Sequence, residues 1–313
     1  MYRPRTGVVV LNYKSVQDTL ACVDSLSLSG DLDLDLVVVD NAAENDETAR
    51  LREAVGDRGQ TIASGGNLGY AAGNNLAIDL LLDRGADLIW ILNPDTVVAP
   101  DTLPRLKAHL DRVPDCGIVG PRLEFSDPPG KIWFDGGIVD RELGVTSHRN
   151  LGRRSKDVKE ESRDVDYVTG ASMLVRRALI EDIGTIPEHY FLYYEETDWC
   201  IRAQRAGWRT MVDGTATMVH HKRSSGTLPQ PYYLYYMTRN RFLFAEDCLG
   251  IDGELALKHL DEKFLSPWRE RVGVRAPELL AGFDEIVAMA KADGRSRVIG
   301  ERPEVTDFEM QRA

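Results

Sequence analysis

The sequence has few cysteines, and those it has are scattered. Four occur in 313 residues, with no C-x-x-C pair among them. This excludes a zinc knuckle or a disulfide framework and favours a reducing compartment, the cytoplasm. Isolated thiols of this kind are typically small buried apolar side chains. They are Cys22, Cys116, Cys200 and Cys248.

Long apolar runs and excess positive charge are also missing. No run approaches the roughly 18 residues of a membrane helix. The opening, MYRPRTGVVVLNY, lacks the form of a signal peptide. Lys and Arg number 38 against 50 Asp and Glu, a net charge of −12. This balance argues against nucleic acid as a partner, while a local basic patch for a membrane surface remains open.

Two common glycine-rich nucleotide loops are absent. The first apolar run leads into Asn12-Tyr13-Lys14-Ser15, with no G-x-G-x-x-G turn after it. No G-x-x-x-x-G-K-[ST] phosphate loop occurs anywhere. A classical dinucleotide-binding fold is therefore disfavoured.

What is present is an alternation of apolar runs and helical patterns. Hydrophobic residues make up 43% of the chain, enough for a sizeable core. The alternation predicts an α/β fold, with a mostly parallel sheet flanked by helices. We expect strands at 7–13, 34–41, 61–63 and 87–92, and helices at 15–28, 46–55, up to Arg84, and from Asp101 to Val113. Ser15 and Asp101 are the expected helix caps.

The pattern changes after residue 115. Residues 118–150 predict short strands and turns, and 167–183 a strand followed by a helix. The charge-dense stretch 152–164 reads either as a solvated mobile loop or as a lid. Helical spacing returns at 199–206 and 255–291, and the tail after Asp293 is expected to be loose.

Polar residues follow three of the predicted strands. They are Asn12, Asp40-Asn41 and Asn93-Pro94-Asp95. Ligands of open α/β sheets bind at the carboxyl ends of strands, so we expect these residues at one edge. Asp40 suits a base or ribose, and Asp95 suits Mg²⁺ or Mn²⁺; turn residues are the alternative for both. The glycine-rich run 64–75 would let an anion approach a helix N-terminus.

Two later clusters carry titratable groups. Glu195-Glu196-Thr197-Asp198 follows an aromatic run, so repulsion and desolvation would raise a pKa and provide a general base. The alternative is acids favoured by a helix dipole. His220-His221 precedes Lys222-Arg223, which suits a metal and a diphosphate, or is a surface pair. Adjacent histidines face opposite sides of a strand, so one at most is expected to ligate.

The order of these motifs resembles family 2 glycosyltransferases of GT-A fold, in particular the bacterial rhamnosyltransferase-like branch. The resemblance extends from about residue 6 to 245. Its motifs are VVVLNY (8–13), VVVDNA (37–42), GNLGYAAGNN (66–75), ILNPDT (91–96), VTGASMLVRR (168–177), YYEETDWCIRAQRAGW (193–208), HHKRSSG (220–226) and YYLYYMTRNRFLF (232–244).

The resemblance implies roles at the matching positions. Asn93-Pro94-Asp95 takes the place of the family's D-x-D, with Asp95 as the metal-binding member and His221 as a second ligand of Mn²⁺ or Mg²⁺. Glu196 is the implied base within the acid pair, beside Glu195, and Asp198 is the runner-up. Thr238-Arg239-Asn240 is expected to contact phosphate or acceptor. The donor nucleotide is expected at Asn12, Asp40, Asn41, Asn67, Gly69, Asn74, Asn93 and Asp95.

The implied activity is inverting transfer of a sugar, rhamnose among the candidates, from a dTDP- or UDP-sugar to a hydroxyl. The acceptor is a glycan, a lipid-linked intermediate at the inner membrane face, or a small molecule. Residues 1–245 would form the catalytic domain and 246–313 a helical extension that docks a partner, a second subunit of a homodimer or a membrane. A nucleotidyltransferase and a non-catalytic sugar- or nucleotide-binding module are the alternatives.

Overall fold

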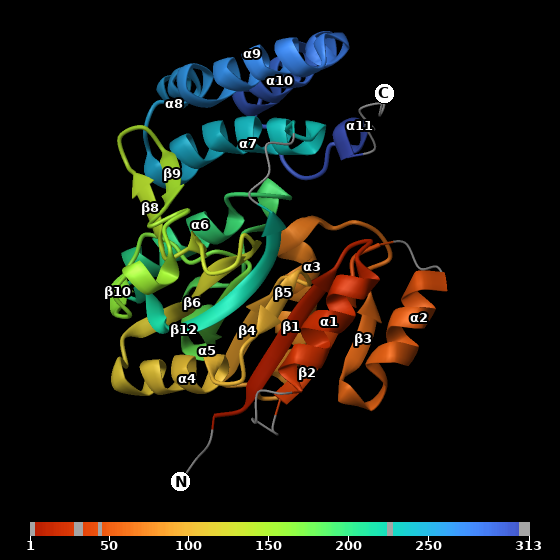
Figure 1. Ribbon diagram of the computed structural model, residues 1–313, viewed down its shortest axis with the longest axis vertical. Coiled ribbons are helices and arrows are strands. Elements are labelled where there is room, and N and C mark those ends of the chain that lie inside the picture. The colour runs from red at the N-terminus through yellow and green to blue at the C-terminus, as the bar shows by residue number, and fades with distance from the viewer. Residues whose placement is uncertain (1–3, 28–33, 43–45, 224–227, 307–313) are drawn as a thin grey trace.

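A computed structural model describes residues 4–27, 34–42, 46–223 and 228–306. Its centre is a ten-stranded sheet with helices packed against both faces (Figure 1). The predicted α/β architecture is confirmed. The four cysteines are free and buried, as their spacing predicted. Among the helices of these described ranges, none is both long and apolar enough to cross a membrane.

The N-terminal half of the sheet is parallel, in the order β4-β1-β2-β3. Every residue of β1 is buried, because helices cover both faces of a parallel sheet. The strands are β1 (Thr6–Asn12), β2 (Leu34–Asp40), β3 (Gln60–Ala63) and β4 (Leu88–Leu92), and the helices are α1 (Val16–Leu26), α2 (Asp46–Val55), α3 (Gly69–Asp83) and α4 (Thr102–Arg112).

The second half of the sheet is mixed. Strand β11 (Ser172–Arg176) is antiparallel to both β4 and β6 (Cys116–Asp127), and β12 (Arg209–Arg223) is parallel to β6. The twelve-residue β6 is longer than the short strands expected there. The remaining strands are β5 (Thr96–Val98), β7 (Ile132–Phe134), the hairpin β8 (Gly137–Asp140) and β9 (Val145–His148), and β10 (Ser162–Asp164).

The last helices form a layer beyond the carboxyl ends of the parallel strands (Figure 1). They have a hydrophobic cluster of their own, to which α7 contributes Leu234 and Tyr236 and α10 contributes Phe283 and Ile286. The predicted domain boundary at residue 245 stays a prediction. The layer contains α7 (Pro231–Leu243), α8 (Gly253–Leu260), α9 (Ser266–Arg275), α10 (Leu280–Arg295) and α11 (Pro303–Thr306), whereas α5 (Arg177–Ile183) and α6 (Glu195–Arg205) pack against the sheet.

Short turns of other helical types join these elements. They are 3₁₀ turns at Gly56–Arg58, Ser155–Asp157, Glu188–Tyr190 and Pro277–Leu279, and π-helical turns at Phe244–Leu249 and Asp261–Leu265.

The two expected helix caps are not formed. The Ser15 hydroxyl donates to Asp18 Oδ2 at 2.6 Å, and the Asp101 carboxylate accepts from Arg105 Nε at 2.7 Å. Neither side chain accepts a backbone N–H of its helix. Each expected cap fails because a partner one turn along the helix competes for the side chain.

The segment 152–164 is mostly exposed, as expected of a solvated loop, and two arginines anchor it to the sheet. The buried Arg122 donates to Asp135 Oδ1 at 3.0 Å and to the carbonyl of Lys159 at 2.9 Å. Arg163 Nη1 donates to Asp135 Oδ2 at 2.6 Å. The buried Asp135 therefore ties the segment to the sheet, and the charges that suggested a free loop are partly used in that contact.

The expectation of a loose tail after Asp293 is wrong for the described residues. Helix α10 continues to Arg295, and Val305 is buried in the C-terminal cluster. The Gly300 N–H donates to the carbonyl of His189 at 3.0 Å. Apolar burial and backbone hydrogen bonds hold this polar stretch in place; residues 307–313 lie outside the described part.

Candidate functional site

The polar residues that end β1 and β2 meet at one edge, as predicted. Asn12 Nδ2 donates to Asp40 Oδ1 at 2.9 Å, and the Asn41 N–H donates to the carbonyl of Asn12 at 2.8 Å. The other carboxylate oxygen of Asp40 accepts from the Thr48 hydroxyl. Asp40 is thus buried with a fixed orientation, and its role toward a base or ribose stays a prediction.

Asn41 shapes the glycine-rich loop before α3. Its Nδ2 donates to Asn67 Oδ1 at 3.2 Å and to the carbonyl of Gly69 at 3.1 Å, and its Oδ1 accepts the Leu68 N–H at 3.0 Å. Gly69 has φ +82°, and a Cβ there would lie 2.4 Å from the carbonyl oxygen of Phe191. This position requires glycine, because both the conformation and the close approach exclude a side chain.

The next turn of α3 contains two buried side-chain amides, those of Asn74 and Asn75. Asn74 is buried, and its Nδ2 donates to the carbonyl of Tyr70 at 2.8 Å, while its Oδ1 has no hydrogen-bond partner among the described residues. Asn75 donates to the carbonyl of Ile186 at 2.9 Å. The predicted donor contact at Asn74 therefore stays untested, and Asn75 serves the packing of α3 on the segment before α6.

Asp95 follows β4 at the same edge and is paired with a histidine. His220 Nε2 lies 3.0 Å from Asp95 Oδ1, and the His220 ring packs edge-on against Trp133 with 4.2 Å between ring centres. His220 is buried, whereas the Asp95 side chain is 28% exposed. Asn93 contributes its backbone N–H to the carbonyl of Ala171 at 3.1 Å. The Asp95 carboxylate is thus partly exposed to solvent, and the buried imidazole of His220 contacts one of its oxygens.

His221, the predicted metal ligand, is exposed, and only its backbone is seen to contact Asp95 in the described residues. Its N–H donates to the Asp95 carbonyl at 2.7 Å across the β12–β5 pair. The side chains of residues 222–226, which include Lys222 and Arg223 and make up the rest of the motif, lie outside the described part, so the predicted diphosphate contact stays a prediction. Within the described ranges no three His, Cys, Asp or Glu side chains gather as a complete metal site. One carboxylate and one imidazole suit a divalent cation that takes its other ligands from a diphosphate and water.

The acid pair opens α6 after a left-handed residue, Tyr194. Glu195 is 3% exposed, and its Oε2 accepts no hydrogen bond within the described residues. Burial, followed by the charge of Glu196, raises the pKa of Glu195 well above its usual range. Burial also raises the pKa of Glu196, although backbone N–H groups, including that of Gly170, favour its charged form.

Asp198 has a different environment from the other two acids. It is 1% exposed and accepts from Arg202 Nε at 2.8 Å and from Arg202 Nη2 at 2.9 Å. Both carboxylate oxygens are engaged in this bidentate ion pair one turn along α6.

Thr238-Arg239-Asn240 does not face a ligand, contrary to the expected phosphate or acceptor contact. All three side chains are buried in α7. Arg239 Nη2 and Asn240 Nδ2 donate to the carbonyl of Tyr190 at 2.6 and 3.0 Å. They serve the backbone that leads into α6, because the helix layer covers them.

Tyr70 is a residue of this region that the sequence analysis did not single out. Its N–H donates to the Phe191 carbonyl at 2.8 Å, and its hydroxyl donates to the Gly170 carbonyl at 2.6 Å. Burial and then the charges of Glu196 and Glu195 raise the pKa of Tyr70 well above its usual range. Its place directly after Gly69, at the start of α3, was the available signal.

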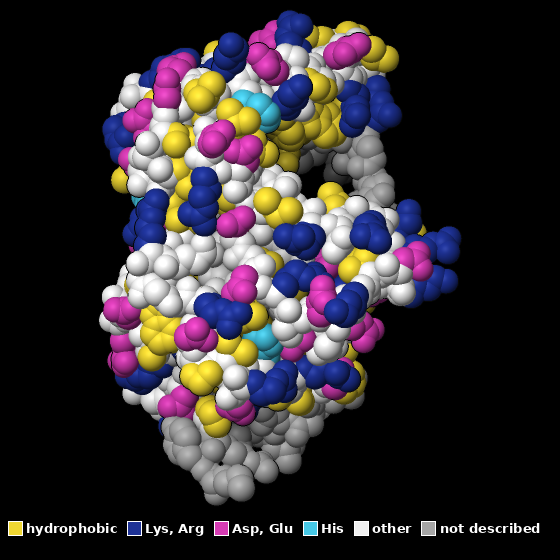
Figure 2. Space-filling view, turned by 90° about the vertical axis from the view of Figure 1, so that its left-hand side faces the viewer, with side chains coloured by type: hydrophobic (Ala, Val, Ile, Leu, Met, Phe, Trp, Pro, Cys, Tyr) yellow, Lys and Arg dark blue, Asp and Glu magenta, His cyan; other side chains and the backbone are white. Residues whose placement is uncertain are grey.

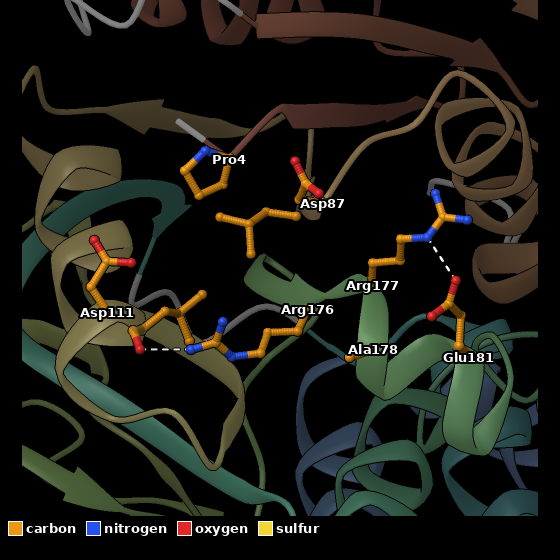
Figure 3. Close-up of a pocket in the computed structure, with 9 residues that line it drawn as sticks. Pro4, Asp87, Asp111, Arg176, Arg177, Ala178 and Glu181 are labelled. Atoms are coloured by element: carbon orange, nitrogen blue, oxygen red, sulfur yellow. Dashed lines mark hydrogen bonds and ion pairs between the residues drawn. The ribbon is translucent and has the colours of Figure 1, made fainter. Parts of the chain in front are cut away.

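A cavity of about 310 Å³ lies at the opposite, amino ends of the parallel strands, lined by Pro4, Asp87, Arg176, Arg177 and Glu181 among others (Figure 3). Its charges are satisfied internally: Arg177 Nε contacts Glu181 Oε1 at 2.7 Å, and Arg176 donates to the Leu110 carbonyl at 2.6 Å. Figure 2 shows acidic and basic side chains interspersed over one face of the molecule. Neither feature competes with the carboxyl edge as the candidate site.

Comparison with known proteins agrees with this geometry. Two curated relatives are a low-salt glycan biosynthesis hexosyltransferase, Agl10, from Haloferax volcanii (27% identical; 76% of this chain, 74% of that protein) and an N-acetylglucosaminyl-diphospho-decaprenol L-rhamnosyltransferase from Mycobacterium tuberculosis (26% identical; 70% and 76%). The mannosyltransferase PcManGT from Pyrobaculum calidifontis, solved with GDP-Man and Mn²⁺, has a TM-score of 0.54 at 14% identity, over 95% of this chain and 87% of that one.

The sequence match to the family Glycosyl transferase family 2 spans residues 7–184, more than half of the chain. The structural likeness carries the fold and confirms the expected GT-A architecture. The chain is therefore a glycosyltransferase that belongs to family 2.

Proposed function

We propose that the chain transfers a sugar, with inversion, from a nucleoside-diphosphate sugar to an acceptor hydroxyl, with Glu196 as general base. One observation carries this. The Gly170 carbonyl accepts a hydrogen bond from the hydroxyl of Tyr70, at the end of the glycine-rich loop. The Gly170 N–H donates a hydrogen bond to the Glu196 carboxylate. The loop and the acid are thus joined through one residue. A direct displacement needs a base opposite the leaving group, and this link supports Glu196 as that base.

The two glutamates have unequal tendencies to ionise. Glu195 is the more strongly buried, and the charge of Glu196 raises its pKa further. Glu196 receives backbone hydrogen bonds that favour its anion. Glu196 therefore ionises first and accepts the hydroxyl proton, and Glu195 stays protonated beside it. Asp198 is a poorer base because Arg202 occupies both of its oxygens.

Asp95 and His221 are the proposed ligands of Mn²⁺ or Mg²⁺, with Asn93 beside them and His220 holding the carboxylate. When bound, the cation neutralises charge on the leaving diphosphate. The donor set supports this, since oxygen with one added imidazole suits Mn²⁺.

The names of relatives support a proposal for the donor and the acceptor. A rhamnosyltransferase name favours rhamnose, carried as a dTDP- or UDP-sugar, and the decaprenyl-diphosphate part of that name favours a lipid-linked acceptor. With such an acceptor, we place the enzyme in the cytoplasm, peripherally at the inner membrane face. The donor nucleotide would contact Asp40, Asn12, Asn41 and the loop at Asn67, Gly69 and Asn74. A homodimer through the C-terminal helices belongs to the same proposal.

Binding of the donor is tested by thermal shift with UDP, dTDP, GDP, CDP, NAD and ATP, each with and without Mn²⁺. At a hundredfold excess over Kd, a ligand of the folded state adds about 2.7 kcal/mol of stability. We expect a Mn²⁺-dependent shift with one nucleoside diphosphate, lost in Asp95→Ala but not in the exposed control Asp101→Ala. A shift with NAD alone, or with no ligand, contradicts the proposal.

Transfer is tested with the matching nucleotide sugars. We expect release of a nucleoside diphosphate; release of pyrophosphate would instead indicate a nucleotidyltransferase. Glu196→Gln should keep donor binding and abolish transfer, and Glu181→Gln, an exposed site on α5, should do neither. Near-normal transfer by Glu196→Gln would overturn the base assignment and make Asp198 the next residue to test.

A further inference from the structure

The segment that leads into the acid pair has an unusual backbone. Phe191, Tyr193 and Tyr194 have φ values of 68°, 70° and 78°. Large aromatic residues rarely adopt this region, and they persist there only where the surroundings hold them. Glu195 follows Tyr194 directly, so the path of these residues sets where both carboxylates of the acid pair lie.

Asn240 of α7 contacts three carbonyls of residues 190–194. Its Nδ2 lies 3.0 Å from the carbonyl oxygen of Tyr190, 2.8 Å from that of Leu192 and 3.0 Å from that of Tyr193. The carbonyl of Phe191, which points elsewhere, accepts the N–H of Tyr70. A single side-chain amide thus contacts three carbonyls that the irregular backbone does not place in helix or sheet hydrogen bonds.

Arg239 orients that amide. Its Nε donates to Asn240 Oδ1 at 2.9 Å, which leaves the Nδ2 group to face the segment. Its Nη2 donates to the Tyr190 carbonyl at 2.6 Å. The guanidinium is buried and lies 4.9 Å from the ring centre of Tyr236. Its third contact, from Nη1 to the Gly300 carbonyl at 2.7 Å, joins the C-terminal segment to the same unit.

We propose that Arg239 and Asn240 are positioning residues, which hold segment 190–194 so that Glu196 meets the acceptor hydroxyl. The inference rests on the proposed function. Through Gly300, the docking of residues 296–306 contributes to the same alignment. Neither side chain is placed to contact the donor, since both are buried against backbone.

The first variant is Asn240→Asp, which keeps the shape and the contact with Arg239 but removes the amide donors. A misplacement of about 1 Å at a reacting group costs about a hundredfold in rate. We expect kcat to fall about a hundredfold, with the Kd of the nucleoside diphosphate in Mn²⁺ changed less than twofold. The acidic limb of the kcat/KM profile should also move, because the surroundings of Glu196 change.

Arg241→Lys is the matched control. Arg241 is another buried arginine of α7, but it donates to the carbonyl of Leu143 in the β8–β9 hairpin. We expect its kcat and its pH profile to match the wild type. Arg239→Lys is the second variant, for use where Asn240→Asp fails to fold. Lysine keeps the charge but cannot make the three-way contact, so kcat should fall with donor Kd retained.

The inference would be overturned if Asn240→Asp or Arg239→Lys folds and keeps a kcat within about threefold of the wild type. The acidic limb of the kcat/KM profile would then also be unchanged. A tenfold weaker donor Kd at normal kcat would overturn it too and restore the phosphate contact. If the wild type transfers sugar and Glu196→Gln does not, such a result removes this inference alone. If the wild type transfers from no nucleotide sugar, the proposed function fails and this inference fails with it.

Discussion

His220 Nε2 lies 3.0 Å from Asp95 Oδ1, so a buried imidazole supports a partly exposed carboxylate in the turn between β4 and β5. The ring is wedged against Trp133, and its Nδ1 has no hydrogen-bond partner among the described residues. The imidazole therefore has few alternatives to this contact. It fixes the direction in which Asp95 presents its other oxygen.

His220→Ala should weaken Mn²⁺-dependent binding of the nucleoside diphosphate about 10- to 100-fold, because groups that orient a ligating carboxylate contribute that much to metal affinity. Titration calorimetry at several Mn²⁺ concentrations measures this. His148→Ala is the control, since His148 also packs edge-on against Trp133, and its Nδ1 lies 3.1 Å from the Trp133 carbonyl oxygen. Unchanged Mn²⁺ affinity in His220→Ala would show that Asp95 needs no such support.

The rate should depend on the ionisation of Glu196. Burial raises its pKa above the ordinary value for glutamate of about 4.3. Because the base must be deprotonated, kcat/KM should fall as the pH falls through that raised pKa. A pH series at saturating Mn²⁺ measures it. An acidic limb at the ordinary glutamate value would contradict the assignment.

Glu195→Gln should stabilise the protein at neutral pH. The folded-state pKa of Glu195 is raised by burial and by the charge of Glu196, so the folded state binds more protons than the unfolded chain. Stability then falls as the pH rises from the ordinary pKa toward the raised one, and glutamine removes that cost. Urea unfolding at a series of pH values from about 4 to 8 measures this change in stability. A loss of stability in the variant that grows as the pH rises would contradict this and argue that Glu195 is needed as an anion.

Asp213→Asn should have the opposite effect. Burial alone would raise the pKa of Asp213, but hydrogen bonds from His109 and Thr215 outweigh burial and lower it. A carboxyl whose pKa is lowered by folding stabilises the folded state above the ordinary aspartate pKa of about 3.9. This stabilisation is lost as the pH falls below that value. We expect a loss of about 1–3 kcal/mol at neutral pH, shrinking in acid.

The contacts behind this prediction are local and buried. His109 Nδ1 lies 3.3 Å from Asp213 Oδ2, and the Thr215 hydroxyl donates to Oδ1 at 2.7 Å. Asp115→Asn, at an exposed ion pair with Arg209, is the control and should change stability by less than about 0.5 kcal/mol. Equal stability losses in the two variants would mean that the buried pair is no stronger than the exposed one.

Local pattern predicted the parallel half of the sheet well. Strands 34–40 and 88–92 and helix 46–55 lie where apolar runs and helical spacing placed them. Burial on both faces leaves a continuous apolar run, which is visible in sequence. The caps at Ser15 and Asp101 failed for the converse reason: a short polar side chain has several local partners, and composition does not choose among them.

The candidate site divides in the same way. Asn12 and Asp40 could be brought together in advance, because parallel strands end at a common edge and each run ends in a polar residue. Alternation along a strand showed that His220 and His221 must face opposite sides. It could not show that the buried one meets the Asp95 carboxylate, because that depends on the register of β12 against β5.

The sequence alone predicted the α/β order, the polar edge and the cluster of acids at 195–198, because each depends on residues that are close together in the chain. Packing between distant segments decided the rest. Arg239 turned out to bind carbonyls at 190 and 300, and His220 to bind the Asp95 carboxylate. A charged side chain in a sequence has many possible partners. Only the folded chain, by excluding water from some of them and aligning others, selects the ones it binds.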